Sequence, residues 1–158
     1  MKTEIMDLLA PSAERLRLLV VDGSEYLERL RELCPNAEIH AITPYHEIAE
    51  DTHVAALGVH AHVLDWRREP LPFAEETFDR IVAEFAIEYA YEPYDTLMAL
   101  NRALKETGTL YTCYTNVRYH RVLTALQGGE FPVRGDRHLY AKPEIVRLLN
   151  DTLYKEIH

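Results

Sequence analysis

Short apolar runs alternate along the chain with amphipathic segments, and this alternation predicts strands and helices in turn. Continuous apolar runs are typical of strands that are buried on both faces of a sheet. The predicted strands cover residues 18–21, 38–42, 59–64, 79–85 and 109–115. The predicted helices cover residues 25–33, 45–57, 94–104, 122–126 and 142–151. We therefore expect an α/β fold with three layers, in which a mostly parallel sheet carries helices on both faces.

Turn signals separate these segments and suggest how the chain is divided. The Lys-Glu-Thr-Gly stretch at 105–108 predicts a turn before the fifth strand, and residues 152–158 leave room for one last strand. After Asn116 the alternation loosens. We expect one domain over residues 1–158, with a core of about 16–116 and a substrate-side C-terminal segment of about 117–158.

Charge and composition restrict the class of partner. The formal net charge is −9 and the pI is near 5.3, which argues against nucleic acid or an anionic membrane as the main partner. A small-molecule ligand fits this balance better. The two cysteines, Cys34 and Cys113, lie far apart and match no disulfide framework, and no apolar run approaches the length of a membrane span. The expected compartment is the cytoplasm.

The stretch LRLLVVDGSEYLERLRELCPN (16–36) has the pattern of a strand, a tight turn and a helix. Such a turn usually cradles a nucleotide-like ligand and carries two or three glycines, whereas this one has only Gly23. Asp22 can take the left-handed backbone conformation at modest cost. Asp22 and Glu25 are also spaced as a capping-box pair, which would compete with a ligand for the helix N–H groups. The turn can therefore still hold a ligand, or it can have closed on itself.

The middle of the chain carries a family resemblance. The segment VLDWRREPLPFAEETFDRIVAEFAIEYAYEPYDTLMALNRALKETGTLYTCYTN resembles the run from the third to the fifth strand of class I S-adenosylmethionine-dependent methyltransferases. It keeps the acid that ends the third strand, Asp65, and the LPF…FD entry to the fourth. The tail, with Asp136-Arg137-His138-Leu139, resembles a subgroup often met beside glycosyltransferases in polysaccharide gene sets. The resemblance implies a Rossmann-like methyltransferase fold, here shortened at the C-terminus.

The chain departs from that family where the cofactor would lie. The acid that normally precedes the glycine turn is replaced by Val20, and two of the glycines are replaced by Asp22 and Ser24. The third glycine is deleted before Tyr26, and the acid that grips the ribose is replaced by Thr43. The resemblance thus implies S-adenosylmethionine as cofactor, with binding that these changes weaken or abolish.

The resemblance also implies the residues of the site. The cofactor-binding candidates are Asp22, Gly23, Ser24, Thr43, Tyr45, Asp65, Trp66, Glu84 and Phe85. The substrate-binding candidates are Tyr89, Tyr119 and Arg137, where Arg137 either binds an anionic acceptor or simply pairs with Asp136. A His base, where the acceptor needs one, would be His120 or His138. The implied activity is methyl transfer to a small molecule, a sugar or a glycan precursor.

Other interpretations compete with this one. A methyltransferase-like domain without catalysis, serving as an interaction or assembly module, would explain the altered turn. A nicotinamide dinucleotide-binding domain is disfavoured, because pyrophosphate needs an open helix N-terminus. His60 and His62 share a strand face near Asp65, yet no second cluster completes a metal site, so we expect no metal. A sheet edge left open near the C-terminus would favour a homodimer.

Overall fold

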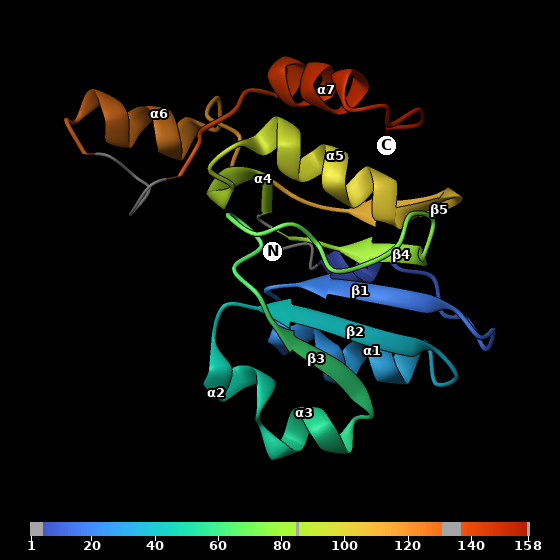
Figure 1. Cartoon of the computed structure of the whole chain (residues 1–158). Helices are drawn as coiled ribbons and strands as arrows, with labels where there is room; N and C mark the ends of the chain where they lie inside the picture. Colours follow the sequence, from blue (N-terminus) through green and yellow to red (C-terminus); the bar gives the residue numbers. More distant parts are fainter. Residues whose placement is uncertain (1–4, 85, 131–136, 158) are drawn as a thin grey trace.

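A parallel five-stranded sheet in the order β3-β2-β1-β4-β5 forms the centre of the protein (Figure 1). The structure is a computed structural model and describes residues 5–84, 86–130 and 137–157. The strands are β1 (Arg17–Val21), β2 (Glu38–Thr43), β3 (Val59–Val63), β4 (Phe78–Val82) and β5 (Leu104–Tyr111). Every neighbouring pair is parallel, so all the carboxyl ends meet at one edge, on the left in Figure 1. The predicted α/β fold with a parallel sheet is confirmed.

Helices cover both faces of this sheet, as the sequence predicted. The helical elements are η1 (Ile5–Leu8), η2 (Ser24–Tyr26), α1 (Leu27–Leu33), α2 (His46–Ala49), α3 (Thr52–Ala56), α4 (Ala86–Tyr89), α5 (Pro93–Ala103), α6 (His120–Gln127) and α7 (Lys142–Asp151). One core packs η1, α1 and α3 on one sheet face, and a second packs α4 and α5 on the other (Figure 1). A third apolar cluster joins α4 and α5 to α7. No helix in the described parts of the chain is long and apolar enough to cross a membrane.

The alternation of side chains along β1 explains the two cores. Leu18 and Val20 pack with α1 on one face, whereas Leu19 and Val21 pack with the cluster that includes α5 on the other. All four side chains are at most 4% exposed. Burial on both faces is why this strand reads as an uninterrupted apolar run.

Three predicted elements differ from the structure at their boundaries. The helix expected over 45–57 is broken into α2 and α3, because the Asp51 carboxylate accepts a hydrogen bond from His53 N and caps a new helix. The turn expected at 105–108 lies inside β5 as a bulge, where Phe78 pairs with Leu104 and Arg80 with Thr109. Strand β4 ends at Val82, so Glu84 follows the strand instead of closing it.

The last strand expected over residues 152–158 is wrong for the described part, since residues 152–157 form a turn and then irregular chain. Instead, the Thr152 hydroxyl donates to the carbonyl of Leu148 at the end of α7. The Tyr154 hydroxyl donates to the carbonyl of Leu97 in α5. The sheet edges are β3 and β5. A homodimer stays a prediction, which light scattering over a range of concentrations would test.

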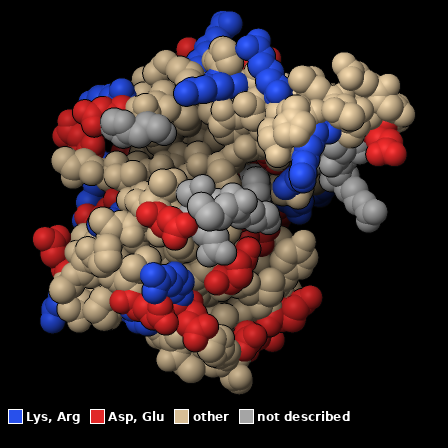
Figure 2. All heavy atoms as spheres, turned by 180° about the vertical axis from the view of Figure 1, so that it is seen from behind, with Lys and Arg blue, Asp and Glu red and all other residues tan. Residues whose placement is uncertain are grey.

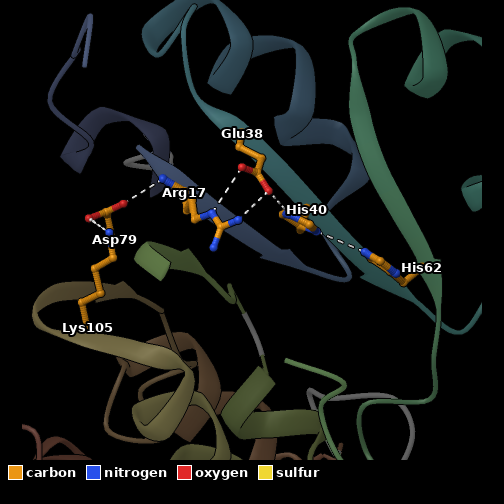
Figure 3. Close-up of polar contacts among 6 residues, drawn as sticks. All are labelled: Arg17, Glu38, His40, His62, Asp79 and Lys105. Atoms are coloured by element: carbon orange, nitrogen blue, oxygen red, sulfur yellow. Dashed lines mark hydrogen bonds and ion pairs between the residues drawn. The ribbon is translucent and has the colours of Figure 1, made fainter. Parts of the chain in front are cut away.

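A chain of polar contacts runs across the sheet from Arg17 at the start of β1 to His62 near the end of β3 (Figure 3). The Arg17 guanidinium on β1 contacts the Glu38 carboxylate on β2 at 3.2 Å, and Glu38 accepts a hydrogen bond from His40 Nε2 at 2.9 Å. His40 Nδ1 lies 3.1 Å from His62 Nε2 on β3. Because a carboxylate can only accept, the His40 proton is on Nε2, and His62 Nε2 is then the donor to His40 Nδ1. The Asp79 carboxylate accepts from the Arg17 backbone N–H at 2.8 Å.

Candidate functional site

A cleft of about 750 Å³ opens at the carboxyl ends of the strands, beside the point where the chain order reverses between β1 and β4. In open α/β sheets ligands bind in the crevice outside this point. The residues that line it are Met6, Val21, Asp22, Glu25, Tyr26, Arg29, Trp66, Glu84, Ala86, Tyr89, Cys113, Tyr114 and Arg137. Five of the predicted site residues are among them: Asp22, Trp66, Glu84, Tyr89 and Arg137.

The turn after β1 forms with a single glycine, because Asp22 itself takes the left-handed conformation. Its φ is 51°, and its carboxylate accepts a hydrogen bond from the Thr43 hydroxyl at 3.3 Å. Thr43 ends β2 and is 4% exposed. The predicted capping box of Asp22 and Glu25 is wrong, since Gly23 precedes the first helical turn and no side chain caps it. Asp22 thus joins the ends of β1 and β2 and lines the cleft, instead of closing the helix.

Tyr26 follows the point where the family's last glycine is deleted, and its side chain reaches across the sheet edge to Glu84. The Tyr26 hydroxyl donates a hydrogen bond to the Glu84 carboxylate, which follows β4. Burial of the phenol, followed by this bond to Glu84, raises the pKa of Tyr26 well above its usual value, so the hydroxyl keeps its proton. A Cβ on Gly23 would lie 2.9 Å from the Tyr26 ring. The absence of a side chain at Gly23 therefore leaves room for the Tyr26 ring beside the turn.

A buried ion pair forms the opposite wall of the cleft. The Glu88 side chain on α4 is completely buried, and its carboxylate lies 3.4 Å from Arg137 Nε. The Thr115 backbone N–H donates to the same carboxylate. The Arg137 guanidinium lies 4.3 Å from the centre of the Tyr89 ring. These contacts fix the plane of the guanidinium at the cleft wall.

Asp65 and Trp66 follow β3, as predicted, but only Trp66 lines the cleft. The Asp65 carboxylate accepts from Arg67 Nε at 3.0 Å and lies 3.6 Å from Arg68 Nε, and it is absent from the cleft lining. Trp66 is 7% exposed, and its indole N–H is buried with no hydrogen-bond partner among the described residues. Trp66 and Val21 also line a second cavity of about 380 Å³, which extends toward α5. Trp66 is therefore a shared wall between the two spaces.

The remaining predicted residues lie outside the cleft lining. Thr43 donates a hydrogen bond to Asp22, which does line the cleft. Gly23 precedes η2, and Ser24 is its first residue. Tyr45 is 49% exposed, and Tyr119, 50% exposed, packs on His120 at the start of α6. His138 Nε2 donates to the Ala90 carbonyl at 3.0 Å, which leaves Nδ1 as its accepting nitrogen. Phe85 and Asp136 lie outside the described residues.

The strand histidines pack against other aromatic side chains. His62 pairs with His40, and the two rings are stacked with centroids 5.4 Å apart. Over residues 5–84, 86–130 and 137–157, no group of three or more His, Cys, Asp or Glu side chains is arranged to hold a metal ion. Phe73 packs its edge against both rings, so these histidines belong to an aromatic cluster on the sheet.

Sequence reasoning missed several cleft residues. Glu25, Tyr26, Arg29, Cys113 and Tyr114 line the cleft without having been named as ligand-binding. Glu88, which does not line the cleft but contacts Arg137 from behind it, was missed as well, although the apolar run that surrounds it in AIEYAY is a signal. A lone acid inside an apolar segment is either exposed on one face or buried with a charged or polar partner. Which residue is the partner can be seen only in the folded structure.

Comparisons with known proteins agree with this fold. Residues 18–112 match the family model described as a methyltransferase domain. A search of curated proteins gives no match. Among solved structures, a Haloferax volcanii protein in complex with the Trm112 methyltransferase activator is 22% identical with a TM-score of 0.70. The match covers 93% of this chain and 65% of the Haloferax protein, so the chain spans slightly less than two thirds of that protein.

Two further structures have the same fold. A S-adenosylmethionine-dependent methyltransferase from Thermotoga maritima is 17% identical with a TM-score of 0.71, over 97% of this chain and 69% of that one. Geranyl diphosphate C-methyltransferase from Streptomyces coelicolor, solved with S-adenosyl-L-homocysteine, is 17% identical with a TM-score of 0.68. That match covers 94% of this chain and 57% of the Streptomyces enzyme.

Proposed function

This chain belongs to the methyltransferase-domain family, and from that premise we propose that it moves a methyl group from S-adenosylmethionine to a small acceptor in the cleft. The observation that carries the proposal is the open cleft at the β1–β4 switch point, which persists although the glycine turn is altered. A sugar or glycan precursor is the proposed class of acceptor, supported by the resemblance of the tail around Arg137.

The side chains of the cleft fit the charges of this cofactor. Its sulfonium and ammonium groups are cationic, and the carboxylates of Asp22, Glu25 and Glu84 line the cleft. Acidic side chains also gather over the lower half of the face that carries α1 (Figure 2). Arg29 lies on the same lining and suits the cofactor carboxylate. We propose that Asp22, held by Thr43, takes the place of the missing ribose acid.

We propose that the adenine lies against Trp66. Trp66 lines the cleft with the small part of its surface that is exposed, and its buried N–H lacks a partner among the described residues. Asp65 is engaged by Arg67 and Arg68, so its proposed contact with the adenine amino group requires that carboxylate to turn. Tyr45, beside Thr43, remains a proposed outer contact.

When bound, the cofactor supplies a methyl group on a positively charged sulfur. The acceptor would take this methyl group through a lone pair, with the electrons of the C–S bond left on sulfur. The chain's part is to hold the acceptor in line and to exclude water. Tyr89 and Arg137 on the far wall are proposed to position it. If the acceptor must lose a proton, His138 Nδ1 is better placed than His120, because His138 lies beside Arg137 and next to α4.

The test uses Trp66 as a site-specific probe, because it is the only tryptophan in the sequence. We expect S-adenosylhomocysteine to change its fluorescence with saturation. Ligand at a hundredfold its Kd should stabilise the fold by about 2.7 kcal/mol. Asp65→Ala tests the adenine contact, and His46→Ala, on the exposed surface of α2, is the control. Saturable binding followed by radiolabelled methyl transfer to sugar phosphates or sugar nucleotides would support the full proposal. No response at millimolar ligand would instead favour a non-catalytic module.

A further inference from the structure

The wall of the cleft opposite the turn after β1 contains a charge arrangement that methyl transfer by itself does not need. Glu88 is completely buried, and its carboxylate lies 3.4 Å from Arg137 Nε. Moving two charges out of water is unfavourable, so a buried ion pair of this kind adds little to folding stability. Its presence on a ligand cleft therefore calls for a different explanation.

The contacts of Glu88 hold three segments of the chain together and fix the guanidinium of Arg137. The Glu88 carboxylate accepts from the Thr115 backbone N–H, and the Glu88 carbonyl accepts from the His138 backbone N–H at 2.9 Å. One residue of α4 thus ties together the segment after β5 and the segment that carries Arg137. The guanidinium is held by Glu88 along its Nε edge and by the Tyr89 ring, 4.3 Å away, across its face. A guanidinium fixed in this way loses little side-chain entropy when it binds a further group.

The Arg137 side chain is one of the residues that line the cleft, with 19% of its surface exposed. Tyr89 and Tyr114 lie on the same wall. The acids Asp22, Glu25 and Glu84 lie on the lining contributed by the turn after β1 and the segment after β4. The cleft thus has an acidic region that suits a cationic cofactor, and a wall on which a guanidinium stands over an aromatic ring.

We propose that Arg137 is an anion-binding residue for the methyl acceptor, and that Glu88 and Tyr89 position it. The acceptor is then a small molecule with a carboxylate or phosphate group, which the planar guanidinium fork binds in a bidentate manner. This proposal rests on the proposed methyltransferase function and narrows its substrate to an anion. Glu88 and Tyr89 are positioning residues, since they act through Arg137.

The experiment measures anion binding to the protein saturated with S-adenosylhomocysteine. Inorganic phosphate and acetate are titrated separately by calorimetry, with chloride adjusted to keep the ionic strength constant. The two arms distinguish a phosphate site from a carboxylate site. We expect saturable binding of at least one anion, weakened about tenfold or more in Arg137→Gln, as expected when a charge-assisted hydrogen bond is lost. Arg118→Gln, an exposed arginine outside the cleft lining, is the matched control and should bind within about twofold of wild type.

Arg137→Gln leaves Glu88 buried without its partner, which can unfold the protein. The double variant Glu88→Gln with Arg137→Gln removes both charges together and avoids this. It should fold, bind S-adenosylhomocysteine as wild type does, and lose the anion. Arg137→Lys keeps the charge without the fork and should bind the anion more weakly than wild type.

The results separate this inference from the function on which it rests. Anion binding that persists in the double variant, or that falls equally in Arg118→Gln, overturns the anion site while leaving cofactor binding intact. The absence of saturable anion binding to the wild-type complex overturns it too. Failure to bind S-adenosylhomocysteine overturns the proposed function, and is read in a separate titration without any added anion.

Discussion

The Tyr26 hydroxyl donates a hydrogen bond to the Glu84 carboxylate, and this bond joins the turn after β1 to the segment after β4. Both residues line the cleft. The bond therefore crosses the switch point of the sheet, where the proposed cofactor would bring its ammonium group. The ammonium and the phenol then compete for one carboxylate.

Tyr26→Phe removes this competition and keeps the ring. We expect the Kd of S-adenosylhomocysteine to fall by about tenfold or more, because a hydrogen bond to a charged group contributes about 1.5–3 kcal/mol. The melting temperature of the free protein should fall slightly. Calorimetric titration of the ligand measures the change. Tyr94→Phe, an exposed tyrosine on α5 outside the cleft lining, is the control. Weaker binding by Tyr26→Phe would show that the hydroxyl is a ligand contact and not a competitor.

Gly23 is the one glycine kept in the turn, and we expect it to be needed for the Tyr26 ring. A Cβ at this position would lie 2.9 Å from Tyr26 Cδ2 and 3.3 Å from Val20 Cγ1. Gly23→Ala should lower the free energy of unfolding by about 1–3 kcal/mol, since overpacking a filled site forces its neighbours to move. Urea denaturation measures this.

The matched control is Gly128→Ala, where the nearest atom would be 3.4 Å away, and its effect should be small. In a Tyr26→Ala background the effect of Gly23→Ala should shrink, because the clashing ring is gone. An undiminished effect there would place the strain in the backbone of the turn.

The turn after β1 also shows how far the sequence could predict the site. That Asp22 takes a left-handed conformation was predictable from residue type. Its side-chain partner was not, because local spacing pointed to Glu25 and a capping box, whereas the structure brings Thr43 from the end of the next strand. The strand pairing that creates this contact is not a local property of the sequence.

The same distinction holds for the fold as a whole. The strands β1, β2 and β3 were predicted closely from apolar runs. Burial on both faces explains the apolar run of β1, whereas β3 is only partly buried along its length. The bulge in β5 was predicted as a turn, since Gly108 gives the same local signal in either setting. Glu88 could not be predicted as the buried partner of a cleft residue, because Arg137 lies far along the chain.

Thr43 links the ends of β2 and β1 through a buried hydroxyl that donates to Asp22 at 3.3 Å. Thr43→Val keeps the shape and removes this donor, and it also removes the acceptor of the Tyr45 backbone N–H. We expect a loss of about 0.5–1.5 kcal/mol in unfolding free energy. S-adenosylhomocysteine should also bind more weakly, because Asp22 is no longer held. Thr43→Ser keeps the hydroxyl and should bind as wild type; equal losses in both variants would mean that the methyl packing matters and the bond to Asp22 does not.

The contacts among Glu38, His40 and His62 predict that acid destabilises the fold (Figure 3). Burial, followed by the charges of His40 and His60, lowers the pKa of His62 from its usual 6.5. As the pH falls below 6.5, the unfolded chain takes up a proton that folded His62 resists, so stability is lost down to the folded pKa and levels off below it. Above 6.5 this group contributes no pH dependence.

The hydrogen bonds from His40 and then Arg17 lower the pKa of Glu38 from 4.5, so its contribution is present above 4.5 and is lost as the pH falls through the folded value. Urea denaturation from about pH 7.5 to about pH 5 isolates the change in unfolding free energy that comes from His62. For one proton, the slope of this free energy against pH cannot exceed about 1.4 kcal/mol per pH unit. His62→Gln should flatten this slope. His46→Gln, exposed on α2, should leave it unchanged. A slope that survives unchanged in His62→Gln would contradict the assignment of this proton to His62.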